Sequence, residues 1–405
     1  MYMESLHVKN VGPFNKLNVK FNPKMNVVVG TNGVGKTSLL RCIAYSQTNH
    51  YLENVRFRKG ASIKMKGVVG DKKYLFGAEN LVDKDQQYRQ TDVKQYQLRS
   101  DDGYEGVNMF QDNDYNLLAI GAYRFISYKR IDGMIRENNV VASRKNYRNS
   151  NPIFLETSQM PDIKQWMINR YFQIDKEWAE VEKSNWNSIM SKLNLISPRN
   201  AEFHFVKIER DLEPIFSING SECYLEELSS GFKSVLSIVL NIVDWIEAVN
   251  EGDNMKIDNA EGTVLIDEID AHLHPSWQST ILTSLREIYP NLQFVVTTHS
   301  PNVIISAKEG EVILFNNYDG VVNAEPEERS FGGWQFNDIL SDLMQSPDLD
   351  RVSLIPELKK LNEAYEQKDI KKFETLLNQV SKKINPNDSI LKVYNLKLSE
   401  LKLNI

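Results

Sequence analysis

Residues 25–45 read MNVVVGTNGVGKTSLLRCIAY, and this stretch decides the fold of the 405-residue chain. An apolar β-branched run ends at Gly30, a loop with the spacing G-x-x-x-x-G-K-T follows, and a helix-like apolar pattern begins at Ser38. Glycines let such a loop wrap closely around an anion, because they adopt backbone angles that a side chain disfavours. The sequence therefore predicts a strand, a phosphate-binding loop and a helix, with a nucleotide held by Gly30, Asn32, Gly33, Gly35, Lys36, Thr37 and Ser38.

Four side chains have specific expected roles in this site. Lys36 is expected to reach the β- and γ-phosphates of ATP, and the hydroxyl of Thr37 to bind Mg²⁺. A second apolar run, 263–266, ends in Asp267 and Glu268. Because ligands bind at the carboxyl ends of parallel strands, we expect Asp267 to hold the same Mg²⁺. Glu268 is then the candidate general base for an attacking water.

The composition is that of a globular protein, with 41% hydrophobic and 25% charged residues. The net charge of −6 gives no global basic field, so any contact with nucleic acid is expected to be local. Two cysteines, Cys42 and Cys223, indicate reduced thiols rather than a disulfide framework. No apolar run reaches membrane-spanning length, and residues 1–10 lack the form of a signal peptide, so we expect a cytoplasmic protein without membrane contact.

The hydrophobic pattern along the chain predicts an α/β fold. Continuous apolar strands separated by helices indicate a parallel sheet covered on both faces. Residues 80–116 are polar and patternless, which indicates an exposed insertion. The predicted elements are strands at 4–9, 17–21 and 26–29, a hairpin at 61–77, a strand at 117–122, helices within 161–195, strands at 203–208 and 214–218, a helix at 231–249, a strand at 263–266, a helix at 276–289, strands at 293–298 and 311–315, and a helical tail from about 350 with breaks near 368–369 and 385–386.

Three further motifs occur in the order found in ABC-type ATPases. Residues 228–234 (LSSGFKS) resemble the signature motif of these proteins, 269–275 (IDAHLHP) resemble the D-loop, and 297–301 (TTHSP) resemble the switch-histidine loop. The chain therefore resembles the RecF/SMC/overcoming-lysogeny-like branch of ABC-type ATPases, and most closely the Septu-defence ATPases. The resemblance covers about 1–125 and 200–340.

This resemblance implies an ABC-ATPase head, in which a P-loop core with a parallel sheet carries an N-terminal antiparallel β-subdomain, a helical insertion and a helical C-terminal tail. We expect four parts along the chain: the N-terminal part of the head (1–125), the helical insertion (126–200), the C-terminal part of the head (201–340) and the tail (341–405).

In the family that the chain resembles, two heads pair head-to-tail and bury two ATP molecules between them. The resemblance implies that Ser229, Ser230 and Gly231 of one subunit contact the γ-phosphate held by Lys36 of the other. A helix that begins here would present free N–H groups and its positive dipole end to that phosphate. The chain departs from the family in having Ser230 in place of glycine and Phe232 in place of Gln, Glu or Lys. If Ser230 needed a glycine-like φ, dimer formation and ATP turnover would be slow.

His299 follows a buried strand, where an imidazole can bond a γ-phosphate oxygen and position water, so it is the second candidate catalytic residue. His272 and His274 have a spacing that metal ligands use, but no Cys or third His lies nearby, which favours a D-loop role in packing across the dimer. Arg124 either points at the nucleotide or pairs with an acid in the core. Phe14, by analogy of position, would lie beside the adenine.

The glutamine with which the family senses Mg²⁺ has one nearby candidate, Gln111, and it fits the expected position poorly. The basic run 129–148 is either a solvated face or a surface for a phosphate backbone. Its cations are Lys129, Arg130, Arg136, Arg144, Lys145 and Arg148.

Three functions fit these patterns. The first is a slow ATPase whose dimer closes on ATP and controls a partner in bacterial anti-phage defence; the resemblance to Septu ATPases implies an HNH-type nuclease, which would dock on 331–334 and 352–402. The residues after His299 lack the acidic clusters of an overcoming-lysogeny nuclease domain, which favours such a separate effector. The second is a RecF-like DNA-binding ATPase in DNA repair that uses the run 129–148. The third is a non-hydrolysing scaffold locked by ATP. The departures from the signature motif at Ser230 and Phe232 are compatible with this function.

Overall fold

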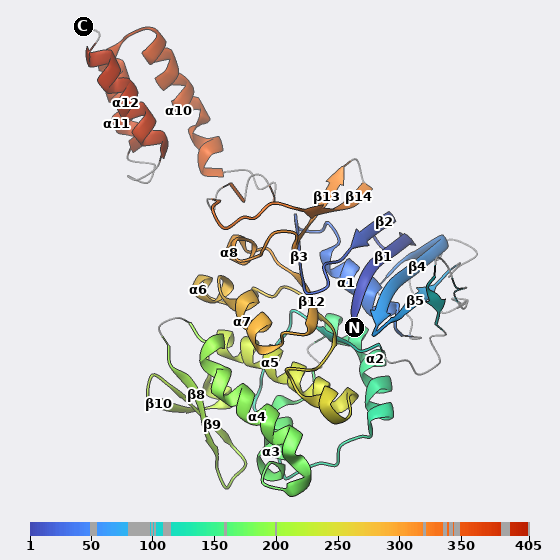
Figure 1. The fold of residues 1–405 in the computed structure, drawn as a ribbon. Helices are drawn as coiled ribbons and strands as arrows, with labels where there is room; N and C mark the ends of the chain where they lie inside the picture. The colour runs from blue at the N-terminus through green and yellow to red at the C-terminus, as the bar shows by residue number, and fades with distance from the viewer. Residues whose placement is uncertain are drawn as a thin grey trace. The chain divides into compact units, whose positions relative to one another are not determined.

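The structure is a computed structural model that describes residues 1–48, 55–79, 98, 100, 103–107, 115–157, 160–198, 201–318, 321–334, 338–339, 343, 349–381 and 389–403. The chain forms two compact units, Met1–Ile339 and Leu340–Ile405. The first unit contains three sheets and the helices around them (Figure 1). The second unit is a small helical bundle with a core of its own.

A six-stranded sheet with the order β14-β13-β3-β12-β11-β7 forms the centre of the first unit. Neighbouring strands from β13 to β7 are parallel, and β14 pairs antiparallel at the edge. Every residue of β3, β7, β11 and β12 is buried, which explains why these strands read as continuous apolar runs. The strands are β3 (Met25–Gly30), β7 (Leu117–Ile120), β11 (Gly262–Ile266), β12 (Leu292–Thr297), β13 (Val312–Tyr318) and β14 (Val321–Glu327).

The helices that pack against this sheet follow the predicted pattern, with two differences. The helix α1 (Lys36–Tyr45) packs on β3, β7 and β12, and α5 (Ser230–Val249) is buried along almost its whole length. The helix predicted at 276–289 is divided into α6 (Pro275–Gln278) and α7 (Ile281–Ile288). The hydroxyls of Ser279 and Thr280 bond back to the carbonyls of Ser276 and Trp277, and such bonds compete with the helix ladder. A short helix that the sequence did not indicate, α8 (Pro301–Ile305), follows β12.

The antiparallel N-terminal sheet has the order β2-β1-β4-β5-β6. It confirms the expected strand pair and hairpin, and the extra strand β6 lies inside the expected polar insertion, most of which is outside the described residues. One face of this sheet packs with α1 in a shared core that includes Leu6, Val8 and Ile63. The strands are β1 (Tyr2–Val11), β2 (Phe14–Lys20), β4 (Phe57–Val69), β5 (Lys72–Ala78) and β6 (Glu105–Gly106).

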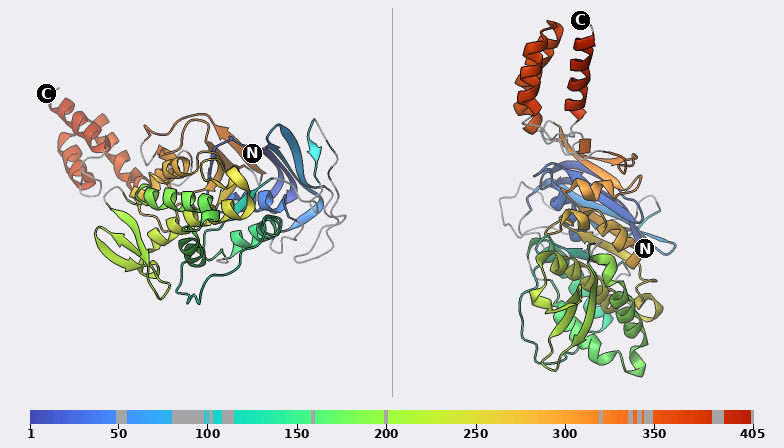
Figure 2. Two further views of the ribbon diagram at one scale, coloured as in Figure 1. Left: turned by 60° about the horizontal axis from the view of Figure 1, so that its bottom comes forward. Right: turned by 90° about the vertical axis from the view of Figure 1, so that its left-hand side faces the viewer.

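Most of the helical insertion and a third sheet lie at the end of the first unit that is remote from the N-terminal sheet, whereas α2 (Val140–Glu156) packs on α1 and β7 near that sheet (Figures 1 and 2). The buried carboxylate of Glu247 on α5 holds this region together, because it accepts hydrogen bonds from Arg170, Trp166 and Asn185. The elements are α2 (Val140–Glu156), α3 (Ile163–Gln173), α4 (Glu180–Lys192), β8 (Phe203–Ile208), β9 (Pro214–Ile218) and β10 (Ser221–Tyr224). The strand β10 was not predicted.

The second unit consists of α10 (Leu349–Glu366), α11 (Ile370–Ser381) and α12 (Ser389–Leu403). Its core includes Leu361, Phe373 and Tyr394. The expected break at 368–369 separates α10 from α11, whereas the expected break at 385–386 lies outside the described residues. In the described part of the chain, no helix is long and apolar enough to cross a membrane.

Candidate nucleotide site

The loop between β3 and α1 has the backbone of an anion cradle. Gly33 and Gly35 adopt positive φ angles of 76° and 108°. A Cβ on Gly35 would lie 2.9 Å from the ring of Phe14, so a side chain is excluded here by space as well as by φ. The Lys36 ammonium donates to the carbonyls of Gly30 at 2.8 Å and Thr31 at 3.0 Å, inside the loop. Burial lowers the pKa of Lys36 to about 8, although three neighbouring carboxylates oppose this shift.

The end of β11 brings Asp267 directly beside the start of α1. The Thr37 hydroxyl donates to Asp267 Oδ2 at 2.9 Å. The Thr297 hydroxyl, at the end of β12, donates to Asp267 Oδ1 at 2.6 Å and accepts from the backbone N–H of Glu268 at 2.8 Å. A hydroxyl and a carboxylate in contact are the hard oxygen donors that Mg²⁺ prefers, so Thr37 and Asp267 fit this ion.

Glu268 and His299 open onto the same space. Glu268 has a positive φ of 45°, an uncommon conformation for a non-glycine residue. Partial burial, with Asp267 and Asp270 nearby, raises the pKa of Glu268 above its usual value. Burial and the Lys36 charge lower the pKa of His299, which favours a neutral ring. Asp270 fixes the loop after β12, because it accepts from the Thr298 hydroxyl at 2.5 Å and from the His299 N–H at 3.3 Å.

These residues surround one cavity of about 500 Å³, a volume typical of small-molecule sites. Its lining is Pro13, Asn32, Gly33, Gly35, Lys36, Thr37, Ser38, Asp267, Glu268, Thr297 and His299. Gly30 contributes through its carbonyl, which Lys36 contacts. The sequence analysis gave Thr297 no individual role in the site. Its position as a polar residue at the end of an apolar strand could have indicated one.

Arg124 does not line the nucleotide cavity and forms no ion pair with a carboxylate among the described residues, so neither predicted role is borne out. Its side chain is buried and donates to the carbonyls of Gly121, Asp267 and Glu268 and to the Ser234 hydroxyl, at 2.8–3.0 Å. Burial lowers the pKa of Arg124 to about 10. The guanidinium therefore ties the chain after β7 to the two acidic residues and to α5.

The signature-like residues lie at the start of α5 and outside the cavity. Ser229 is the N-cap, Ser230 is the first helical residue without a positive φ, and Phe232 is buried against Phe203 and Trp277. A Cβ on Gly231 would lie 2.4 Å from the Trp277 ring. Ser230 therefore does not adopt a glycine-like φ, and the side chain of Phe232 is part of the hydrophobic core.

Phe14, His272 and His274 all make contacts within the protein. Phe14 is fully buried and packs against Phe315, so its predicted place beside the adenine is wrong. His272 packs on the ring of Phe125, and His274 caps α6 by accepting from the Ser276 N–H. No group of three metal-binding side chains occurs among the described residues. Gln111 lies outside them.

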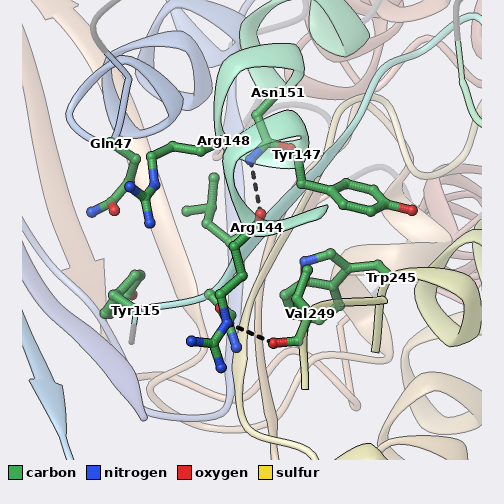
Figure 3. Close-up of a pocket in the computed structure, with 10 residues that line it drawn as sticks. Gln47, Tyr115, Arg144, Tyr147, Arg148, Asn151, Trp245 and Val249 are labelled. Atoms are coloured by element: carbon green, nitrogen blue, oxygen red, sulfur yellow. Dashed lines mark hydrogen bonds between the residues drawn. The ribbon is translucent and has the colours of Figure 1, made fainter. Parts of the chain in front are cut away.

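Two cations in the second half of the basic run, Arg144 and Arg148, face the protein, whereas Lys145 is exposed. Figure 3 shows Arg144 and Arg148 of α2 extending toward a recess beside Gln47, Tyr115 and Val249. Arg144 donates to the Val249 carbonyl at 2.8 Å. In the first half, Lys129 pairs with Asp162 and Arg130 with Asp132. Lys129, Arg130, Arg136 and Lys145 are exposed, so the run is divided between cations that face solvent and two arginines that face the protein.

Comparison with known proteins agrees with this geometry. Residues 192–306 match the family model described as "AAA domain, putative AbiEii toxin, Type IV TA system". The chain is 26% identical to Septu protein PtuA of Bacillus thuringiensis over 99% of this chain and 98% of that protein. It is 27% identical to the retron Ec83 probable ATPase of Escherichia coli over 66% of this chain and 46% of that protein.

Among solved structures, the SMC head domain of Pyrococcus furiosus matches with a TM-score of 0.50 and 15% identity, over 81% of this chain and 96% of that chain. The α/β fold of an ABC-ATPase head and the predicted resemblance to ABC-type ATPases near PtuA are thereby confirmed.

Proposed function

We propose that this chain is an ATPase that acts as a nucleotide-gated switch and controls a partner nuclease in anti-phage defence. The observation that carries the proposal is the cavity that gathers Lys36, Thr37, Asp267, Glu268 and His299 from three strand ends. The names of two relatives, Septu protein PtuA and a retron probable ATPase, support the same assignment.

Mg²⁺·ATP, when bound, would supply the phosphoryl group and the ion that offsets its charge. Lys36 would exchange its bonds to the loop carbonyls for phosphate oxygens, while Thr37 and Asp267 hold the ion. Glu268, whose pKa is raised, would take the proton of the attacking water, and neutral His299 would orient that water. Thr297 and Arg124 would keep the backbone of Glu268 in place through the bonds described above.

We propose that the chain forms a head-to-tail homodimer around ATP. The start of α5, with Ser229, Ser230 and Gly231, has the free N–H groups that a terminal phosphate requires. The ordinary backbone of Ser230 and the core position of Phe232 support a dimer that hydrolyses ATP over a non-hydrolysing scaffold. The second unit, with its own core, is the proposed docking element for an HNH-type nuclease.

The test is ATP turnover by the purified chain, with and without duplex DNA, against Glu268→Gln. This variant keeps the shape of the side chain but lacks the base, so turnover should fall by about 10²- to 10⁴-fold while ATP binding persists. Light scattering should show Glu268→Gln as a dimer with ATP and as a monomer without it. If the parent chain turned over ATP no faster than Glu268→Gln, the non-hydrolysing scaffold would be the remaining function.

Two results would redirect the biological assignment. Turnover that rises with duplex DNA would favour the RecF-like alternative. Affinity capture of the chain from cells that carry its native gene neighbourhood should recover a nuclease, and this recovery should be lost when residues 349–405 are removed. Capture of the chain alone would count against the effector model.

A further inference from the structure

The chain that follows β7 has a backbone edge without hydrogen bonds. Residues 123–128 belong to no helix or strand, and their backbone N–H and C=O groups make no hydrogen bond within the described part of the chain. Figure 1 shows the stretch that leads into α2 as coil. Exposed backbone of this kind is a template on which another chain can form a strand. We call residues 123–128 the open edge.

The strand before the open edge is closed by a side chain. β7 is the last strand of the six-stranded sheet, and Asn151 of α2 covers its outer side. The Asn151 amide accepts from the Ala119 N–H and donates to the Leu117 carbonyl, both at 2.8 Å, and Figure 3 shows the second of these bonds. It therefore takes the hydrogen bonds that a neighbouring strand would make. Among the described residues, no side chain does the same for the open edge.

The side chains of the open edge alternate as they do in a β-strand. Tyr123, Phe125 and Ser127 are exposed, whereas Arg124 is buried and Ile126 is half-buried. The four hydrogen bonds of Arg124 hold the centre of the open edge in place. A partner strand would therefore meet a backbone that is already fixed, which lowers the entropy cost of binding.

A recess of about 250 Å³ adjoins the open edge. Phe125 and Ile163 contribute apolar surface to this recess, and Ser127, Lys129 and Ser237 contribute polar groups. The recess can therefore receive a side chain of a partner strand that pairs with the open edge.

The surroundings of the open edge carry a positive charge. Four basic residues lie between positions 123 and 136, against the single acid Asp132. Arg124 is buried, but Lys129, Arg130 and Arg136 are exposed. Lys129 and Arg130 form ion pairs at the surface, which a partner carboxylate can replace at small cost. In a chain whose net charge is −6, this local excess favours an acidic partner.

We propose that the open edge binds an extended acidic peptide segment of a partner protein, which adds a strand to it. Backbone pairing supplies affinity, the recess beside Phe125 takes one side chain, and the exposed cations contact carboxylates of the peptide. A nucleic acid would contact the rings and the cations but would not pair with the backbone in strand register, so the unpaired backbone favours a peptide. The inference is independent of the proposed ATPase, since no residue of the open edge lines the nucleotide cavity.

The test measures, by fluorescence anisotropy, binding of a labelled peptide of alternating Glu and Val to the full chain without nucleotide. Two further peptides carry N-methyl groups on the Glu or on the Val residues, so each lacks the N–H groups on one side of the strand. The protein variants are Ser127→Pro, which removes an N–H of the open edge, and the double variant Lys129→Glu with Arg130→Glu. The control is Ser330→Pro, the same change at an exposed position outside helices and strands.

The unmodified peptide should bind the parent chain with a Kd below about 100 µM. Binding should weaken at least ~10-fold for one of the two N-methylated peptides and for each protein variant, whereas Ser330→Pro should stay within about twofold of the parent chain.

Three results would overturn the proposal. The first is no binding of the peptide at about 1 mM, and the second is equal binding of all three peptides, which would show that charge alone is recognised. The third is self-association of the chain that Ser127→Pro abolishes while the peptide does not bind, which would assign the open edge to a second copy. Failure of the proposed ATPase would show only in the turnover assay and would leave these results unchanged.

Discussion

Two clusters of charged side chains in the first unit differ in how many of their hydrogen bonds the chain itself satisfies. Around Glu247, both carboxylate oxygens accept bonds, from Arg170 at 2.6 Å and from Trp166 and Asn185 at 3.0 Å. In the nucleotide cavity, by contrast, the Glu268 carboxylate and the His299 ring have no hydrogen-bond partner among the described residues. A saturated cluster stabilises the fold, whereas an unsaturated one is left for a ligand.

The largest expected effect is in the saturated cluster. Glu247→Ala should lower the free energy of unfolding by about 3–5 kcal/mol, because it leaves the Arg170 charge buried with fewer partners. ATP affinity should not change. Urea unfolding followed by Trp fluorescence gives the first quantity and a fluorescent ATP analogue the second.

Glu247→Gln is the matched control, because it keeps an acceptor for Arg170 and should lose less stability than the alanine variant. A loss below about 1 kcal/mol for Glu247→Ala, or a change in ATP affinity, would contradict the assignment of this cluster to stability alone.

The next effect is in the unsaturated cluster. Lys36→Ala should weaken ATP binding by at least ~100-fold, because it removes the cation that reaches the phosphates. The free energy of unfolding should change by less than about 1 kcal/mol, since the lysine bonds only to two carbonyls of its own loop. Lys16→Ala, at an exposed position of β2, controls for loss of charge. If Lys36→Ala were unfolded at room temperature, Lys36 would be a residue that stabilises the fold, as Glu247 is.

The sequence predicted most of the nucleotide site because its signals are local. One signal is the spacing from Gly30 to Thr37, and the other is the pair Asp267 and Glu268 after an apolar strand. Each signal lies within a short stretch of sequence. The parallel strands then bring the two stretches together, as a sheet of this type requires.

The remainder depends on contacts between residues that are remote in sequence. Thr297 meets Asp267 across 30 positions, and Arg124 bonds carbonyls 143 and 144 positions away. No local pattern shows which acceptor a buried cation will find. Strand register, which aligns His7 with Lys64, likewise joins positions that are remote in sequence. In the basic run 129–148 four of the six cations are exposed, whereas Arg144 and Arg148 turn toward the protein, a difference that charge counted along the chain does not show.

Arg124 belongs to both kinds of cluster, because its fully hydrogen-bonded side chain supports the backbone of the nucleotide cavity. Arg124→Lys should lower the free energy of unfolding by about 2 kcal/mol, because an ammonium cannot reach all four acceptors. Turnover should fall about tenfold as the Glu268 backbone loses one restraint, with ATP affinity little changed. Ser234→Ala removes one of the four acceptors, and this acceptor is not part of Glu268. The variant should therefore lower the free energy of unfolding without lowering turnover. Equal losses of turnover in the two variants would contradict a positioning role.

The smallest effect is on the pH dependence of ATP binding. The pKa of Lys36 is about 8, so the nucleotide-free protein loses this charge as the pH rises through 8. Since phosphate binding requires the charged form, ATP affinity should be about tenfold weaker at pH 9 than at pH 7. The unfolded chain, with an ordinary lysine pKa of about 10.4, binds more protons between these values, so Lys36 should make the free protein more stable as the pH rises from 8 to 10. Lys36→Arg keeps its charge throughout and should give a flat affinity profile. A flat profile in the parent chain would mean that burial does not suppress the lysine charge, and that this part of the cavity is as well solvated as the surface.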